Sequence, residues 1–260
     1  MLLAADIGNT NTVFGLWDKD SLVSTFRVSS RHNRTADEWS ITLRSWLKSK
    51  NFPPAAITEF AMCSVVPALN EILAKAMQSL GCSDCYEYAF DKDLPLTFEY
   101  DNPRLLGADR VVNAIAAVEL FGDNLIVADY GTAITFCKIE QRVHCGGLIV
   151  PGIEAALSGL ATKSAQLPQL GYAEQPDICA KNTMQGIQAG IHYGYRGMLN
   201  EIMNELLLSF KPANRANVIR LVTGGVSPSI GYFHEFFDVV DSALTLKGLR
   251  FLREQAKGKI

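Results

Sequence analysis

The sequence predicts an α/β protein of two similar halves, each built on a mixed sheet flanked by helices. The first observation behind this class is a segment, residues 4–10 (AADIGNT), that returns in similar form as residues 127–133 (VADYGTA). The second is that each copy follows an apolar, β-prone run and precedes two further strand-like runs. The third is that both halves then continue through buried strands and amphipathic helices. The second half therefore repeats the plan of the first.

The first half begins with a predicted strand over residues 1–5 and a predicted hairpin. Residues 12–16 and 22–28 are its two strands, and Asp18-Lys19-Asp20 is the turn between them. A helix should follow, because residues 35–38 (TADE) match a capping box. Apolar residues lie at helical spacing behind this box: Trp39, Leu43, Trp46 and Leu47.

The next predicted elements are a buried strand and a helix. Residues 60–66 form a continuous apolar run, as a buried strand requires, and Pro67 suits the first turn of the helix behind it. Gly81 should end that helix. Its single apolar face consists of Leu69, Ile72, Leu73, Ala76 and Leu80.

The link between the halves, residues 91–109, is predicted to be mostly loop because it contains Pro95, Asn102-Pro103 and Gly107. The second half then repeats the order of the first. Its predicted elements are a leading helix (110–121), three strands (124–128, 134–139 and 143–150), a helix (151–160), a long helix (183–210), a strand (218–222) and a final helix (246–257).

The long helix carries Gly186, Gly190 and Gly194 at intervals of four residues. Each glycine inside a helix costs on the order of 1 kcal/mol relative to alanine, so this stripe indicates close packing against another backbone. The partner is either the protein's own sheet or helices, or a second subunit.

Composition and charge restrict the class of partner. The chain has 260 residues, of which 48% are hydrophobic and 20% charged, with a net charge of -3 and a pI near 5.8. These values give no electrostatic reason to expect nucleic acid or a membrane surface as the partner, so a small ligand is expected. The N-terminus lacks a signal-peptide core and no apolar run reaches the length of a membrane span, which predicts a cytoplasmic protein.

The six cysteines are expected to be mostly small core residues, with no disulfide framework. Cys82 and Cys85 have the spacing of a metal half-site or a redox pair. No second close Cys or His pair completes a zinc tetrad, so neither zinc nor redox function is expected.

Each repeated segment has the chemistry of a nucleotide clamp. Its glycine lets backbone N–H groups approach phosphate oxygens, its Thr or Asn adds donors, and Asp6 or Asp129 can hold a cation directly or through water. One such segment alone is most often an ordinary turn. Recurrence in matched context favours a phosphate site. Thr223-Gly224-Gly225, after a late strand, is either a further backbone approach to nucleotide or a plain tight turn.

Residues 100–110 (YDNPRLLGADR) lie between the two clamps and pair an acid with a base. Phosphorylating an alcohol needs a carboxylate that orients the hydroxyl or accepts its proton, and a cation that holds an anionic substrate. Asp109 and Arg110 can supply both. The alternative is a helix-terminal aspartate beside a surface arginine.

Two halves that each carry a hairpin sheet with a D-x-G turn, and face each other across a cleft, describe a duplicated actin-like (ribonuclease H-like) two-lobe fold. This is the architecture of actin-like ATPases and sugar kinases. We expect an N-terminal lobe of residues 1–105 and a C-terminal lobe of residues 106–260.

Seven strings, in order over essentially the full length, make the chain resemble the type III pantothenate kinases of the coenzyme A pathway. They are DIGNTNTVFG from Asp6, SVVP from Ser64, YDNPRLLGADR from Tyr100, DYGTAITF from Asp129, GGLIVPG from Gly146, KNT from Lys181 and TGG from Thr223. The resemblance implies phosphorylation of pantothenate to 4'-phosphopantothenate, with ATP and Mg²⁺ as cofactors and a homodimer as the assembly.

The resemblance also implies site residues. ATP phosphates and Mg²⁺ would be contacted by Asp6, Ile7, Gly8, Asn9, Thr10, Asn11, Thr12 and Val13. Asp129 would bind a monovalent cation, K⁺ or NH₄⁺, and Thr132 the nucleotide. The pantothenate site would be lined by Tyr100, Gly107, Ala108, Asp109 and Arg110, with Asp109 as the catalytic base. Thr183 would meet pantothenate from the partner subunit.

The chain departs from the family at the end of the second clamp, where members often have an acidic residue and this sequence has Phe136-Cys137. We expect the change to tune cation or nucleotide affinity at most. Two other functions are compatible with the residues alone. One is an actin-like ATP-binding regulator, and the other is a kinase for a different small alcohol or sugar.

Overall fold

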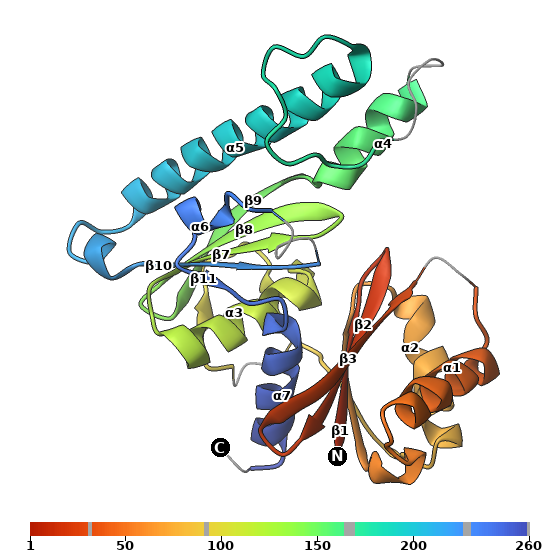
Figure 1. Cartoon of the computed structure of the whole chain (residues 1–260). Helices are drawn as coiled ribbons and strands as arrows, with labels where there is room; N and C mark the ends of the chain where they lie inside the picture. The colour runs from red at the N-terminus through yellow and green to blue at the C-terminus, as the bar shows by residue number, and fades with distance from the viewer. Residues whose placement is uncertain (31–32, 91–93, 164–169, 226–229, 259–260) are drawn as a thin grey trace. The chain divides into compact units, whose positions relative to one another are not determined.

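Each half of the chain builds a sheet of its own in the computed structural model, which describes residues 1–30, 33–90, 94–163, 170–225 and 230–258. The chain divides into two compact units (Figure 1). The first comprises Met1–Leu94, Asn102–Ala116 and Leu244–Ile260, and the second Pro95–Asp101 and Ala117–Ala243.

The first unit contains a five-stranded sheet in the order β3-β2-β1-β4-β5. The three N-terminal strands pair antiparallel, and β4 and β5 add in parallel beside β1. The strands are β1 (Leu2–Ile7), β2 (Asn11–Asp18), β3 (Ser21–Ser29), β4 (Glu59–Ser64) and β5 (Asp84–Glu87).

Helices cover both faces of this sheet (Figure 1). On one face, α1 (Ala36–Ser49) and α2 (Pro67–Ser79) bury their apolar stripes against Phe14 and Leu16. On the other face lies α7 (Leu244–Ala256), whose Leu246 side chain fills the space beside Gly15. Successive strand residues point to opposite faces, so a sheet covered twice needs the nearly continuous apolar strands that β1 and β4 have.

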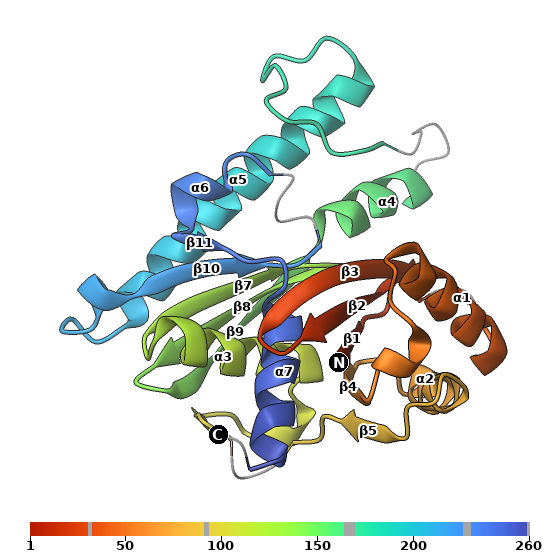
Figure 2. The same ribbon diagram turned by 60° about the horizontal axis from the view of Figure 1, so that its bottom comes forward.

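The second unit contains a six-stranded sheet in the order β11-β10-β7-β8-β9-β6. Its strands are β6 (Thr97–Phe98), β7 (Leu125–Tyr130), β8 (Ala133–Glu140), β9 (Val143–Pro151), β10 (Ile219–Thr223) and β11 (Val239–Val240). On one face lie α4 (Ile153–Lys163), α5 (Thr183–Ser209) and α6 (Phe233–Phe236), and the end of α3 (Ala108–Phe121) lies on the other (Figure 2).

The two sheets confirm the predicted duplication. Strands β7, β8 and β9 pair antiparallel like β1, β2 and β3, and β10 and β11 add in parallel like β4 and β5. Among the strands of the described residues, β6 alone has no counterpart, since it adds in parallel at the β9 edge. The order and the pairing pattern are those of the expected actin-like fold.

The boundary between the units differs from the expected lobes, residues 1–105 and 106–260. Residues 95–101 belong to the second unit because β6 pairs with β9 there. Helix α7 belongs to the first unit because Leu246 packs on its sheet. The change of unit falls inside α3, after Ala116.

Candidate active site

The first clamp is a tight turn between β1 and β2. Asp6 lies one residue before the end of β1, and the N–H of Gly8 donates to the carbonyl oxygen of Asn11 at 3.1 Å. Asn9, at the tip of the turn, is exposed. Ile7 and Thr12 are fully buried, and the Thr12 and Ser30 hydroxyls share a 2.8 Å hydrogen bond. These two side chains therefore hold the turn and do not face solvent.

Cys63 lies beside Asp6 on the neighbouring parallel strand, β4, and its Sγ atom is 3.7 Å from Asp6 Oδ1. The thiol is completely buried. Burial raises the pKa of Cys63 well above its usual value, and the nearby charges of Asp6 and Asp109 raise the pKa further. The neutral thiol thus donates to the Asp6 carboxylate and is within electrostatic range of the Asp109 carboxylate, one from each of the predicted motifs. Sequence reasoning had not selected Cys63, because its role depends on strand pairing.

Asp109 lies in the first turn of α3, which begins at Ala108, two residues earlier than expected. Its Oδ1 atom accepts the N–H of Arg110 at 2.8 Å. The same oxygen lies 2.5 Å from an ideal Cβ at residue 107, so a side chain there would require the Asp109 carboxylate to shift. Arg110 is buried rather than on the surface.

Burial raises the pKa of Asp109, and the Arg110 N–H and the Arg110 charge oppose that shift without cancelling it. The direction is opposite to the one expected from the helix N-terminus, because desolvation of a buried carboxylate outweighs the dipole. A raised pKa brings a carboxylate closer to the working range of a general base.

The second clamp, in the second unit, has backbone hydrogen bonds like those of the first, with a turn that is one residue shorter. The N–H of Gly131 donates to the carbonyl oxygen of Ala133 at 3.1 Å, which closes the turn between β7 and β8. In the first copy Ser30 donates to Thr10 at 2.9 Å, and in the second Gly152 donates to Thr132 at 3.0 Å. A side chain at Gly152 would meet the carbonyl oxygens of Gly131 and Thr132. Asp129 is half-buried at the end of β7.

Gly224, in the TGG string, has a φ of +105°, and a Cβ there would collide with the backbone of Tyr130 beside the second clamp. Only glycine suits this conformation and this close approach. Gly224 therefore lies directly against the strand that carries Asp129.

Tyr100 belongs to the second unit, where it follows β6 and is 40% exposed. Its ring meets the ring of His144 on β9 edge to face. Thr183 is the exposed first residue of α5, whose cap is the Asn182 side chain. No heavy atom lies within 4 Å of an ideal Cβ at Gly186, Gly190 or Gly194, so in the described part of the chain these glycines pack against nothing.

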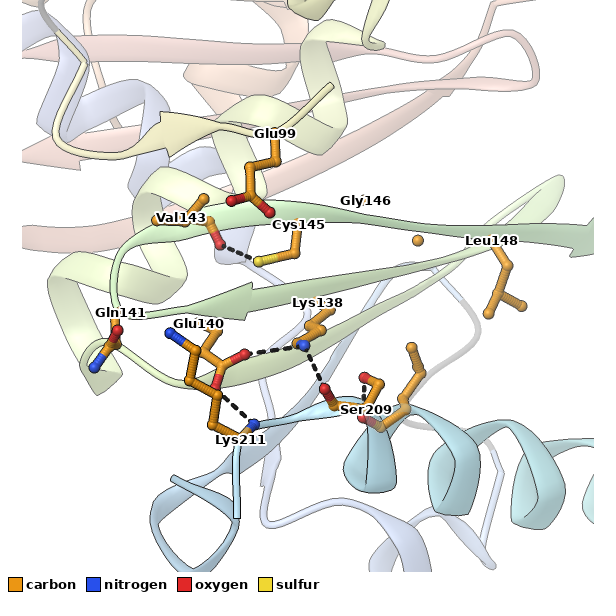
Figure 3. A pocket seen from close by; sticks show the side chains of 12 residues that line it. Glu99, Lys138, Glu140, Gln141, Val143, Cys145, Gly146, Leu148, Ser209 and Lys211 are labelled. Atoms are coloured by element: carbon orange, nitrogen blue, oxygen red, sulfur yellow. Dashed lines mark hydrogen bonds and ion pairs between the residues drawn. The ribbon is translucent and has the colours of Figure 1, made fainter. Parts of the chain in front are cut away.

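A cavity of about 500 Å³ opens in the second unit beside β8, β9 and the end of α5 (Figure 3). None of the predicted site residues lines it. Lys138 bridges Glu140 Oε2 at 3.0 Å and donates to the carbonyl oxygen of Ser209 at 2.9 Å. Figure 3 shows Lys138 paired with Glu140, whose carboxylate also accepts the backbone N–H of Lys211, so these side chains join β8 to the end of α5.

The carboxylates of the predicted site fit a magnesium ion that is held mainly by phosphate oxygens. Among the described residues no group of three or more His, Cys, Asp or Glu side chains could hold a metal ion. Mg²⁺ in phosphoryl-transfer sites usually needs only one or two carboxylates besides phosphate oxygens and water. Asp6 at the strand end meets that requirement.

Within the described ranges, no helix has the length and apolar character that crossing a membrane requires.

Two like sheets, each with a D-x-G turn at the end of its first strand, define a protein of the actin-like class. MreB 5 of Spiroplasma citri, solved with AMPPNP, has this fold with a TM-score of 0.53 and 11% identity, over 99% of this chain and 97% of that one. A conserved putative Baf family transcriptional activator from Campylobacter jejuni superimposes with a TM-score of 0.57 at 20% identity, over 98% and 99% of the two chains.

The sequence comparisons are more specific. The family model for type III pantothenate kinase matches residues 2–205. The type III pantothenate kinase of Geotalea daltonii is 37% identical over 258 residues, which is 98% of both chains. The chain therefore belongs to the type III pantothenate kinase family, as the seven strings predicted. Phosphorylation of pantothenate, the first step of coenzyme A biosynthesis, is the activity of this family.

Proposed function

We propose that the chain transfers the γ-phosphoryl group of ATP to the primary hydroxyl of pantothenate with Asp109 as the base. The observation that carries this assignment is the environment of Cys63, whose thiol donates to Asp6 and whose pKa is raised by the charges of both Asp6 and Asp109. The Asp6 carboxylate, near the end of β1, and the Asp109 carboxylate, in the first turn of α3, thus both act on one buried thiol. Phosphoryl transfer needs this combination, because its catalysis is mostly positioning and charge neutralisation.

In this proposal the hydroxyl oxygen attacks the γ-phosphorus in line, the bond to ADP breaks, and the hydroxyl proton passes to Asp109. The backbone of residues 6–13 and the Thr132 hydroxyl contact the nucleotide, and Asp6 orients Mg²⁺ through phosphate or water. Mg²⁺ neutralises charge on the phosphates when bound. Asp129 holds a monovalent cation, K⁺ or NH₄⁺, and Tyr100 and residues 107–110 line the pantothenate site.

We further propose a cytoplasmic homodimer in which Thr183 completes the pantothenate site of the partner subunit. The open stripe of Gly186, Gly190 and Gly194 supports this assembly. Among the described residues nothing packs beside these three glycines, and their cost to helix stability would be offset by a second backbone at the same face.

The decisive experiment compares Asp109→Asn with the wild type in a coupled assay of pantothenate-dependent ADP release. We expect kcat to fall by about two or more orders of magnitude, within the range for removal of a general base. The asparagine should keep the fold, because its side-chain oxygen can still accept the Arg110 N–H. Turnover within a few-fold of the wild type would remove Asp109 from the role of base.

The same assay with a panel of small alcohols and sugars separates this function from the two others compatible with the residues. ADP release only with pantothenate supports the proposal. Release with another alcohol would reassign the substrate, and ATP binding without turnover would favour a regulator.

A further inference from the structure

His144 is a buried polar ring in β9 that the proposed reaction leaves without a role. Its side chain has no exposed surface. Its Nδ1 atom accepts the N–H of Gly146 at 3.3 Å, and Gly146 has a φ of +102°. An imidazole that accepts at Nδ1 carries its proton on Nε2 when neutral. Burial and this hydrogen bond hold the ring in one orientation.

Two aromatic rings from the segment around β6 lie against His144. Phe98 stacks on it with ring centroids 5.7 Å apart and an interplanar angle of 29°. Tyr100 meets it edge to face at 6.3 Å and 77°. Both distances are in the range where aromatic pairs attract each other.

The backbone brings the same residues together. Phe98 is the register partner of His144 in the β6–β9 ladder, and the N–H of Glu99 donates to the carbonyl oxygen of His144 at 3.0 Å. Tyr100 is the next residue, and it lies beyond the end of β6, outside the strand pairing with β9. Its side chain is 40% exposed, and the edge-to-face contact with the buried His144 ring restricts its orientation.

We propose that His144 is a positioning residue for pantothenate binding, which fixes the ring of Tyr100 at the substrate site. The proposal rests on the proposed function, in which Tyr100 lines the pantothenate site. A Val or Leu side chain would pack in the core at this strand position without burying polar nitrogen atoms. An aromatic ring adds a directional contact that an aliphatic side chain lacks.

Two substitutions separate the ring from its hydrogen bond. His144→Phe keeps a flat ring for Tyr100 and loses the acceptor for Gly146, whereas His144→Asn keeps an acceptor near the Nδ1 position and loses the ring. Cys145→Ser, at the adjacent residue of β9, is the matched control. Aromatic pairs contribute about 0.5–1.5 kcal/mol, so we expect His144→Asn to raise the KM for pantothenate about two- to tenfold with little change in kcat.

We expect His144→Phe and Cys145→Ser to stay near the wild-type KM. In a Tyr100→Leu background, His144→Asn should add nothing further, because the ring it positions is gone. Wild-type KM in a folded His144→Asn variant would overturn the proposal, and so would an equal loss in the phenylalanine and asparagine variants.

A second measurement does not depend on turnover. In protein labelled with ¹³C-tyrosine, the ring signal that disappears in Tyr100→Leu belongs to Tyr100. We expect this signal to move towards the position of a free tyrosine in His144→Asn and to stay dispersed in His144→Phe. An unmoved signal in His144→Asn would reject the positioning role. A wild type without pantothenate turnover would reject the proposed function, while the ring signal would still decide whether His144 positions Tyr100.

Discussion

Two opposing effects act on the pKa of Asp109, and only one of them can be recognised from the sequence. Its place at a helix start is readable from the residues and favours the ionised carboxylate. Its burial is not readable, because the side chain folds back over Gly107 only once the loop has its conformation. Burial is the larger effect, so the pKa of Asp109 is raised. The candidate base was therefore predicted from sequence, whereas the direction of its pKa shift was not.

This shift predicts a pH-dependent effect of Asp109→Asn on stability. A carboxyl group whose folded pKa is raised contributes stability below its unfolded pKa of about 4, and this contribution is lost as the pH rises through the folded pKa. Asparagine does not titrate. We therefore expect Asp109→Asn to gain stability relative to the wild type between pH 4 and pH 8. Urea unfolding of both proteins at the two pH values measures the difference, and an equal difference at both would contradict the burial argument.

At the scale of elements, the strongly patterned segments were predicted and the short edge strands were not. The capping box of α1 forms as expected, with the N–H of Glu38 bonded to the Thr35 hydroxyl and the N–H of Thr35 to the Glu38 carboxylate. Strands β5, β6 and β11 and helix α6 were missed. Each has four residues or fewer, and each depends on a neighbour that is distant in sequence.

Gly248 in α7 shows the same dependence on a distant neighbour and leads to a second prediction. An ideal Cβ there would lie 2.3 Å from the carbonyl oxygen of Val112 in α3, and three residues earlier the Thr245 hydroxyl donates to Asn113 at 2.7 Å. Alanine normally stabilises a helix by about 1 kcal/mol over glycine. Here it must push α7 away from α3, so we expect Gly248→Ala to destabilise the protein by about 1–3 kcal/mol.

The matched control is Gly159→Ala in α4, where an added Cβ meets no atom within 4 Å. This variant should be neutral or more stable by up to about 1 kcal/mol. Chemical unfolding of the two variants beside the wild type checks the contrast. Equal effects at the two glycines would mean that α7 and α3 do not need this close approach.

At the scale of the whole molecule, the duplication was the feature most readily predicted from the sequence. Both copies close the turn with the glycine N–H, and in both the residue after the third strand donates to the turn. The division into units was harder to predict, because α3 is one continuous helix that passes from the first unit to the second after Ala116. A periodic pattern identifies a helix but cannot say which sheets its two ends pack against.

Assembly is the remaining property at this scale, and α5 provides its test. Gly186, Gly190 and Gly194 lie on one stripe with open space beside them, and Met184 and Tyr193 are exposed on the same helix. The alternative of packing within the same chain has no support among the described residues. A second subunit is the partner that the proposed homodimer supplies, since glycines allow two helix backbones to approach closely.

We therefore expect Gly190→Leu to weaken the homodimer by at least about fivefold in Kd, because even a modest clash in a close helix contact costs about 1–3 kcal/mol. Sedimentation velocity over a range of protein concentrations measures the change. Glu205→Leu, about four turns further along α5, adds a similar apolar side chain and should leave the dimer intact. If Thr183 completes the partner's site, the Gly190→Leu monomer should also bind pantothenate weakly while it still binds ATP. A folded Gly190→Leu protein that sediments as an unchanged dimer would place the interface elsewhere.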